Sequence, residues 1–375
     1  MTALKVMPIV GVRPQIIKSA PVLRALSHKT EIDLQLVNSG QHYDYEMSKV
    51  FFNELDLPKP VCDWNVGSGS HAVQTARLLM RAEKTIEKLK PDVVMVFGDA
   101  NTSLGAALAA VKMHTPVCHI ESGLRSYDML MPEEVNRVLI DHCSQMLCSP
   151  TLTAVENLKK EGICEERIFL SGDTMYDSFL THRRDVKKST ITRDLKLMRK
   201  KYAVLTVHRA ENVDTPEKLK DIILTVGNLK ETTVVFPVHP RVRKRLEDEG
   251  LTVILRHAEN IVLTDPLGYF DMLSLMKNAK VVLTDSGGMQ KEAFMLHVPC
   301  LTLRDTTEWT ETIESGANKL VGTSRERILE EARKILSNEE IEEKLACLPN
   351  HYGNGKASEK IVENLLARNI GISDR

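Results

Sequence analysis

The feature that most constrains the fold is a regular alternation of short apolar runs with longer amphipathic stretches. In the first half the runs include LKVMPIV, VVMVFGD and VCHIESG, and the stretches between them include a helix expected over residues 71–89. Strands that are apolar throughout and separated by helices are typical of a parallel sheet covered on both faces. A second series begins at YAVLTVH, residues 202–208, and continues with TVVFPVH, VVLTDSG and PCLTLRD. The sequence therefore predicts an α/β fold with two doubly wound halves.

The length of 375 residues also points to two domains, because single cores stop growing at about 250–300 residues. A strongly charged segment, residues 178–200, suits a surface connector between them. We place the first domain at residues 1–175 and the second at 176–356. The last stretch, 357–375, carries Ile361, Leu365 and Leu366 at helical spacing and is predicted to be a final helix.

The charge balance excludes several classes of function. Fifty Lys and Arg against 51 Asp and Glu argue against nucleic acid or an anionic membrane surface as partners. No run approaches the ~20 apolar residues that cross a bilayer. The seven cysteines form no CxxC pair and no common zinc pattern, so we expect no metal site and a reducing, cytoplasmic compartment.

Polar clusters follow the apolar runs, at the sheet edge where ligands bind in open parallel sheets. The segment VVLTDSGGMQKEAF leads from a strand through Ser286, Gly287 and Gly288 directly into a helix. Backbone N–H groups and the positive end of the helix dipole favour a phosphate there, and Glu292 is placed to accept hydrogen bonds from a ribose diol. The pattern predicts a site for a ribose diphosphate. The alternative is a glycine-rich turn followed by a solvated glutamate.

Basic residues follow other strands. The first turn, GVRPQ, lacks the GxGxxG pattern of a dinucleotide site. Arg13 offers a planar fork for phosphate or carboxylate and Lys18 adds a point charge, although both also suit a solvated loop. His208 and His239 each end an apolar strand. His208, beside Arg209, is suited either to donate to a diphosphate or to cap its loop.

Three acids stand at strand or helix ends in the first half. Asp99 follows VVMVFG and Glu121 follows VCHI, where an acid is costly unless it is paired or used. Glu133 follows Pro132 at a predicted helix start, where an acid also serves as a cap. Asp99 and Glu121 are therefore predicted to be functional, and both readings stay open for Glu133.

Together these segments closely resemble the non-hydrolysing UDP-N-acetylglucosamine 2-epimerase family, from about Val6 to Ile361. The matching stretches, in order, are GVRPQIIK, GQHYD, KPDVVMVFGDANTSL, HIESGLRS, PEEVNRVLIDH, TVHRAEN, PVHPR, TDSGGMQKEA and LRDTTEWTE. The resemblance implies two Rossmann-like domains in the GT-B arrangement, with the active site in the interdomain cleft. It also implies that the final helix, 357–375, rejoins the first domain.

The resemblance implies inversion at C2 of a UDP-2-acetamido sugar, through elimination of UDP to a glycal and re-addition, without a cofactor. It makes Asp99, Glu121 and Glu133 acid/base candidates and places His208 at the diphosphate. The implied substrate-binding residues are Arg13, Lys18, Arg209, His239, Ser286, Gly287, Gly288 and Glu292. We also expect a cytoplasmic homodimer that supplies a precursor for a polysaccharide or another glycan.

Three departures bear on the sugar. Most family members read GTRPE, QEEA and TERPE where this chain has Gln15, Lys291 and the pair Trp309-Thr310. The pattern GxRPQ, QKEA and TEWxE resembles the branch that acts on UDP-2,3-diacetamido-2,3-dideoxyglucuronate, which we expect as substrate ahead of UDP-N-acetylglucosamine. Loss of an acid at Gln15 favours an anionic sugar, whereas loss of an arginine at Trp309 removes a partner for the sugar carboxylate. Residues 40–47 read GQHYDYEM instead of GQHRQM, which weakens the expectation of activation by a second substrate molecule.

Other functions remain open at this stage. A GT-B glycosyltransferase would share the UDP site but needs an acceptor surface, which the three acids suit less well than they suit proton transfer. A hydrolysing 2-epimerase would release the free sugar. A non-catalytic UDP-sugar sensor would bind without turnover.

Overall fold

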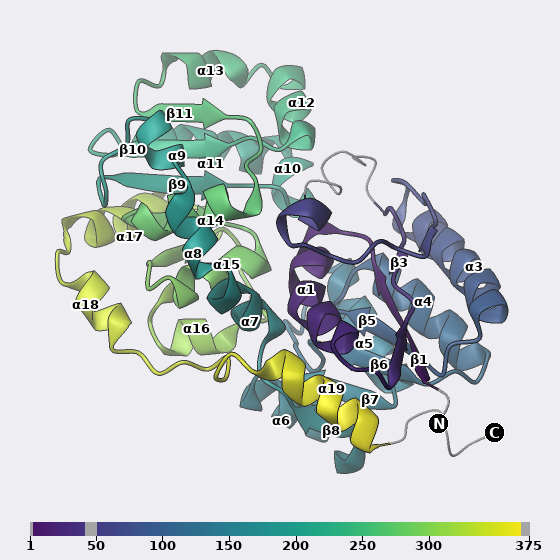
Figure 1. Cartoon of the computed structure of the whole chain (residues 1–375). Coiled ribbons are helices and arrows are strands. Elements are labelled where there is room, and N and C mark those ends of the chain that lie inside the picture. Colours follow the sequence, from purple (N-terminus) through teal and green to yellow (C-terminus); the bar gives the residue numbers. More distant parts are fainter. Residues whose placement is uncertain (1–2, 42–50, 369–375) are drawn as a thin grey trace. The chain divides into compact units, whose positions relative to one another are not determined.

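The computed structural model describes residues 3–41 and 51–368, which form two compact units (Figure 1). One unit comprises the chain up to Thr181 together with the chain from His351 onward, and the other spans His182–Asn350. The domain boundaries expected from the sequence, after residue 175 and before residue 357, remain a prediction. Each unit has its own parallel sheet, so the prediction of two doubly wound α/β halves is confirmed.

The described part of the first unit contains an eight-stranded sheet in the order β4-β3-β1-β5-β6-β7-β8, with β2 also beside β1. Every pair is parallel. The strands are β1 (Leu4–Val10), β2 (Ile32–Leu34), β3 (Val37–Asn38), β4 (Cys62–Asp63), β5 (Val93–Phe97), β6 (Val117–Ile120), β7 (Met146–Ser149) and β8 (Ile168–Leu170). The central strands β5, β6 and β7 are buried along their whole length, and their residues are apolar apart from His119 in β6 and Ser149 in β7.

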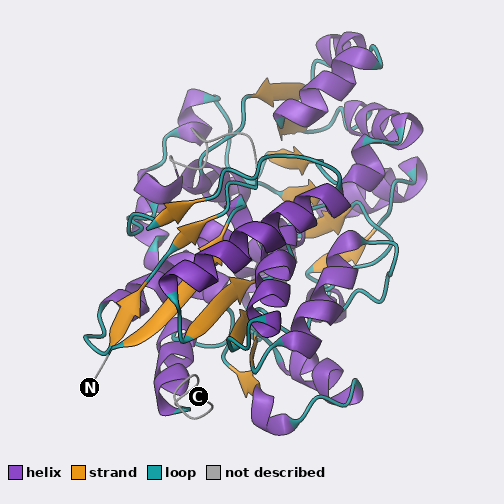
Figure 2. Ribbon diagram, turned by 90° about the vertical axis from the view of Figure 1, so that its right-hand side faces the viewer, coloured by secondary structure: helices purple, strands orange, loops and turns teal. Residues whose placement is uncertain are grey.

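In Figure 2, which draws the whole chain, helices (purple) flank the strands (orange), and in this unit helices follow most of the strands along the chain. They are α1 (Arg13–Ser27), α3 (His71–Leu89), α4 (Asn101–Lys112), α5 (Pro132–Cys143), α6 (Leu152–Lys160), α7 (Thr174–Thr181) and α19 (Ala357–Ala367), with a 3-10 turn at Glu165–Arg167. The helix expected over residues 71–89 is confirmed as α3, which ends at Lys90 in a left-handed conformation. The final helix, α19, packs against α1 and α7 (Figure 1). Its first turn is capped by Asp177, whose carboxylate accepts hydrogen bonds from the backbone of Ala357 and Ser358.

The second unit contains a six-stranded sheet in the order β11-β10-β9-β12-β13-β14, again parallel throughout. The strands are β9 (Tyr202–Thr206), β10 (Thr233–Pro237), β11 (Ile261–Thr264), β12 (Val281–Thr284), β13 (Cys300–Thr302) and β14 (Asn318–Leu320). The longer helices are α11 (Pro216–Gly227), α12 (Pro240–Asp248), α14 (Tyr269–Asn278), α15 (Gly287–Met295) and α17 (Arg325–Ser337). The shorter helices are α8 (Arg183–Lys188), α9 (Ile191–Asp194), α10 (Ala210–Val213), α13 (Thr252–His257), α16 (Thr310–Glu314) and α18 (Ile341–Ala346).

Three further observations concern features expected from composition. All seven cysteines lie in the described part of the chain and are free thiols. Within residues 3–41 and 51–368, no cluster of His, Cys, Asp or Glu side chains is arranged to hold a metal ion. None of the helices in these ranges combines the length and the apolar character that a membrane span requires.

Candidate active site

Two of the predicted acids lie at one edge of the first sheet. Asp99 comes just after β5 and Glu121 comes directly after β6, and β5 and β6 are neighbours in the sheet. Because the carboxyl ends of parallel strands lie at the same edge, the two acids are brought together there. Helix α5 reaches the same edge, since Arg137 on this helix forms an ion pair with Asp99.

Glu121 combines burial with a strained backbone. Its φ angle is 70°, a left-handed conformation that is uncommon for a residue other than glycine. Its side chain is only 7% exposed and pairs with the ammonium group of Lys18 on α1. A Cβ atom at Gly98 would lie 2.9 Å from Lys18 Nζ and 3.3 Å from Glu121 Oε1, so the ion pair lies directly against this glycine. Strain of this kind, about 1–3 kcal/mol, persists mainly where function requires it.

Asp99 belongs to an ion-pair network that the sequence did not assign. Arg137 Nε and Nη2 donate to Asp99 Oδ2 at 2.9 and 2.6 Å, and Arg137 Nη1 donates to Glu134 Oε2 at 2.8 Å. Glu134 also accepts hydrogen bonds from the backbone N–H groups of Ser126 and Tyr127. Glu134 thus holds the chain just before α5, and Arg137 fixes the Asp99 carboxylate.

Glu133 lies in the first turn of α5, next to Pro132, and is partly exposed. The capping and proton-transfer readings both fit this position. Its helix is nevertheless held close to Asp99, because Asn136 Nδ2 donates to the Asp99 carbonyl oxygen at 2.8 Å. A proton-transfer role for Glu133 remains a prediction.

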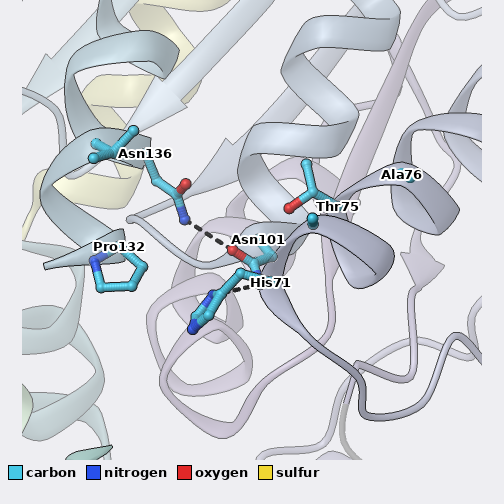
Figure 3. Close-up of a pocket in the computed structure, with 8 residues that line it drawn as sticks. His71, Thr75, Ala76, Asn101, Pro132 and Asn136 are labelled. Atoms are coloured by element: carbon cyan, nitrogen blue, oxygen red, sulfur yellow. Dashed lines mark hydrogen bonds between the residues drawn. The ribbon is translucent and has the colours of Figure 1, made fainter. Parts of the chain in front are cut away.

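A pocket of about 470 Å³ adjoins this group. It is lined by residues of α3, α4 and α5, among them His71, Thr75, Asn101, Pro132 and Asn136 (Figure 3). Asn136 Nδ2 donates to Asn101 Oδ1 at 3.1 Å, and Asn101 Nδ2 lies 3.2 Å from His71 Nδ1. The pocket therefore offers polar groups beside the backbone that carries Asp99.

The three residues of interest near the start of α1, Arg13, Gln15 and Lys18, have different surroundings. Arg13 is partly exposed and its guanidinium lies 4.7 Å from the centre of the Phe51 ring, whereas Lys18 is buried against Glu121. Gln15 is 1% exposed, and its amide oxygen accepts from the N–H groups of Gly11 and Val12. Its amide nitrogen donates to Phe97 O and Ser103 Oγ. Gln15 is therefore occupied in capping α1 and contacts protein groups on both sides of its amide.

The glycine-rich turn of the second unit has the geometry that its sequence indicated. β12 ends at Thr284, Ser286 is the N-cap of α15, and its hydroxyl oxygen accepts from the Met289 N–H at 3.4 Å. A Cβ atom at Gly287 would lie 2.1 Å from Glu308 Oε1, so a larger residue requires the Glu308 side chain or the turn to shift. Glu292 lies one turn further along α15 and is 5% exposed, which is more buried than a solvated surface glutamate.

His208 is oriented by a residue that sequence reasoning missed. Asp285, fully buried after β12, lies 2.9 Å from His208 Nδ1 and accepts hydrogen bonds from the backbone N–H groups of His208 and Arg209. Burial by itself would raise the pKa of Asp285, but the charge of His208 and these hydrogen bonds lower it. Because Nδ1 is held by Asp285, the partly exposed His208 ring is left with Nε2 for a ligand. An acid placed directly before Ser286 at the end of an apolar strand was the available signal.

The other predicted site residues of the second unit, Arg209, His239 and Gly288, lie at the starts of helices. His239 is the exposed N-cap of α12, and its Nδ1 accepts from the Arg241 N–H at 3.3 Å, which fits the capping reading. Arg209 is the N-cap of α10 and is partly exposed. Gly288 lies in the first turn of α15. All of them follow the carboxyl ends of strands in the second sheet.

Two of the departures from the family pattern meet in this unit. Lys291 is fully buried, and its Nζ lies 4.1 Å from the centre of the Trp309 ring. Trp309 is itself 2% exposed. A buried ammonium over an indole face is a favourable cation–π contact. The two substitutions therefore form one packed pair, and neither side chain lines an open surface.

Two doubly wound α/β units, one with a glycine-rich helix start and the other with acids at its strand ends, are of the kind found in enzymes that bind nucleotides. A model of the UDP-N-acetylglucosamine 2-epimerase family matches residues 24–366. The UDP-N-acetylglucosamine 2-epimerase of Methanocaldococcus jannaschii is 45% identical over 96% of this chain and 99% of that protein. The UDP-2,3-diacetamido-2,3-dideoxy-D-glucuronate 2-epimerase of Pseudomonas aeruginosa is 40% identical over 96% of this chain and 99% of its own.

The comparison with solved structures points to the same family as these relatives. The M. jannaschii UDP-GlcNAc 2-epimerase, crystallised with UDP-GlcNAc and UDP, superposes with a TM-score of 0.91 at 43% identity, covering 97% of this chain and all of that one. The chain belongs to the UDP-N-acetylglucosamine 2-epimerase family and is an epimerase of nucleotide sugars. The resemblance seen in the sequence is thereby confirmed, as is the assignment to the isomerases.

Proposed function

We propose that this protein inverts C2 of a UDP-2-acetamido sugar by eliminating UDP and adding it back. The observation that carries the proposal is the pair of acids at one sheet edge, Asp99 and Glu121, the second buried in a strained turn. One carboxylate removes the C2 proton as the bond between C1 and the UDP oxygen breaks, which leaves a 2-acetamidoglucal and UDP. A second acid then protonates the opposite face of C2 while UDP adds to C1. Proton transfer of this kind contributes about 10²–10⁴-fold.

The second unit supplies the groups that suit UDP. We assign the backbone N–H groups of Gly287 and Gly288 to a phosphate and Glu292 to the ribose, since the Ser286 N–H donates to Thr284 Oγ1 at 3.0 Å. We assign His208, held by Asp285, to the diphosphate as it leaves and returns. Arg13 and Arg209 add positive charge for the same group. The mechanism requires that these residues and the acids of the first unit act on one substrate molecule.

Solvent hydrogen exchange tests the elimination step. The abstracted proton resides on a carboxylate that equilibrates with water before the glycal is reprotonated. Turnover in heavy water, followed by proton NMR, is expected to give epimer that carries deuterium at C2. Epimer without deuterium would contradict elimination and favour an oxidation–reduction route.

Two sugars compete as the natural substrate. The relative at 45% identity is named for UDP-N-acetylglucosamine and the one at 40% for the diacetamido-uronate. The motif pattern around Lys291 and Trp309 favours the uronate. The electrostatic argument does not, because Gln15 and Trp309 are buried against protein groups. We therefore propose UDP-N-acetylglucosamine first and the uronate second, which reverses the order that the sequence suggested.

A panel of both nucleotide sugars read by NMR decides between them. We expect kcat/KM for UDP-N-acetylglucosamine to exceed that for the uronate. The opposite order would make the uronate the preferred substrate. The same spectra separate the other functions: a transferase needs an acceptor, a hydrolase releases free sugar, and a sensor shows no turnover.

We further propose a cytoplasmic homodimer that supplies a glycan precursor. The free thiols fit a reducing compartment. Exposed apolar side chains on two helices of the first unit, Val73 and Met80 on α3 and Leu139 on α5, are available for a second copy. Light scattering on the purified chain tests the dimer.

A further inference from the structure

A fully buried histidine lies behind the acids of the first unit. His119 is the third residue of β6 and is 0% exposed. Its Nδ1 lies 2.7 Å from Asp141 Oδ1 on α5, and its Nε2 lies 3.1 Å from the carbonyl oxygen of Gly98. Both distances are those of hydrogen bonds.

Both partners of this ring are acceptors. A neutral imidazole has one N–H donor and one bare nitrogen, so either tautomer would turn a lone pair toward the carboxylate or toward the carbonyl. An unmade hydrogen bond in a buried site costs about 1–3 kcal/mol. Only the doubly protonated, positively charged ring donates to Asp141 and Gly98 together.

The surrounding charges support a cation at this position. Asp141 Oδ2 accepts from Arg125 Nη1 at 2.7 Å, and Arg125 donates in turn to both oxygens of Glu161 at 2.6 and 2.8 Å. The charges therefore alternate along His119, Asp141, Arg125 and Glu161. Burial would raise the pKa of Asp141, but the charges and hydrogen bonds of His119 and Arg125 lower it.

The same groups fix the backbone on both sides of the acids. Gly98 precedes Asp99, and its N–H donates to Ile120 O at 2.8 Å while its carbonyl accepts from His119. Asp141 Oδ2 accepts from the Gly123 N–H at 3.0 Å, two residues beyond Glu121. Asp141 also lies on α5, the helix that carries Glu133. One ring thus connects the three segments that bear the predicted acid/base groups.

We propose that His119 is a doubly protonated positioning residue, which holds Asp99, Glu121 and Glu133 in register through Gly98 and Asp141. The roles of these three acids rest on the proposed function, whereas the charge of the ring does not. The ring itself contacts only protein groups in this arrangement. Its contribution is to keep the carboxylates where proton transfer requires them.

The charge state is measured first, on the intact wild-type protein. Histidine side chains labelled with ¹⁵N report whether each ring nitrogen carries a proton, and a His119→Gln sample assigns the signal among the 12 histidines. We expect both ring nitrogens of His119 to carry a proton at pH 7, because each lies within hydrogen-bonding distance of an acceptor. A bare ring nitrogen at pH 7 would overturn the proposal, whether or not the enzyme turns over.

The positioning role is measured with matched variants. His119→Gln keeps one donor but removes the charge, and His119→Phe removes both donors at similar size. We expect kcat to fall about 10²-fold or more with UDP affinity changed less than about twofold, because the predicted UDP contacts are Arg13 and Lys18 on α1 and residues of the other unit. The control is His142→Gln on α5, the helix that carries Asp141; His142 is half-exposed at the outer end of the network, and its Nε2 lies 3.1 Å from Glu161.

The outcomes separate the two proposals. Loss of turnover in His119→Gln, with normal turnover in His142→Gln, supports the positioning role. Turnover in His119→Gln within about threefold of wild type would refute it and leave the epimerase function untouched. If the His119 variants fail to fold, Asp141→Asn in the labelled protein decides, because loss of the carboxylate that Nδ1 contacts is expected to leave one ring nitrogen of His119 without a proton at pH 7. A ring that still stays doubly protonated there would refute the coupling to Asp141.

Discussion

Replacement of Glu121 by glutamine is expected to lower both turnover and stability. Glutamine keeps the shape of the side chain but neither accepts nor delivers the C2 proton. We expect kcat to fall by about 10²–10⁴-fold, or roughly 3–5 kcal/mol, while UDP affinity is largely kept. Turnover is followed by NMR and UDP binding by calorimetry.

The same change should lower stability, because Lys18 loses its charged partner. The two side chains are 9% and 7% exposed, and removing one member of a buried ion pair costs about 3–5 kcal/mol. The glutamine oxygen still accepts from the ammonium, so we expect the low end of this range, about 3 kcal/mol. For a unit of this size that corresponds to a fall in Tm of about 6–12 °C.

A double variant separates chemistry from stability. Lys18→Gln together with Glu121→Gln removes both charges, so most of the lost Tm should return while turnover stays low. The single variant Glu121→Gln retaining more than about a tenth of wild-type kcat would refute the acid/base assignment. A single variant with unchanged Tm would refute the burial argument instead.

Three further changes test the second unit. Glu292→Ala should weaken UDP binding by about 1.5–3 kcal/mol, and calorimetry showing unchanged affinity would remove Glu292 from the site. Gly287→Ala should weaken UDP binding, because its Cβ would lie 2.1 Å from Glu308 Oε1 and the turn or the Glu308 side chain must shift; wild-type affinity would show that this shift does not reach the predicted phosphate site. The pKa of Asp285 is lowered in the folded state, so its stabilisation is complete above the ordinary carboxyl pKa of about 3.9 and is lost as pH falls through the lowered value. The free energy of unfolding of Asp285→Asn should therefore fall less steeply between about pH 6 and pH 2 than that of the wild type. An unchanged pH dependence would refute this.

Local patterns were sufficient for the elements and for the place of the site. A buried strand can be predicted from its own apolar residues alone, and the polar residue that follows it lies at the sheet edge where ligands bind. Asp99, Glu121 and the Ser286 turn could be found in this way. The sequence also identified α3 and the final helix from spacing alone.

The partners of those residues could not be found in the same way, because a hydrogen bond depends on where distant segments meet. The sequence did not pair Lys18 with Glu121, which lies 103 positions away, or Asp285 with the backbone of His208, 77 positions away. For the same reason Gln15 was read as a residue that faces the sugar, whereas the fold buries it as a cap.

The sequence by itself determined the two α/β halves, the family and the acids at the strand ends, since these depend on residue type and short-range spacing. Only the tertiary structure decided which acid is strained, which histidine is oriented by a carboxylate and which is enclosed between two acceptors. Those properties arise when parallel strands place their carboxyl ends at one edge and bring residues far apart in the chain within hydrogen-bonding distance.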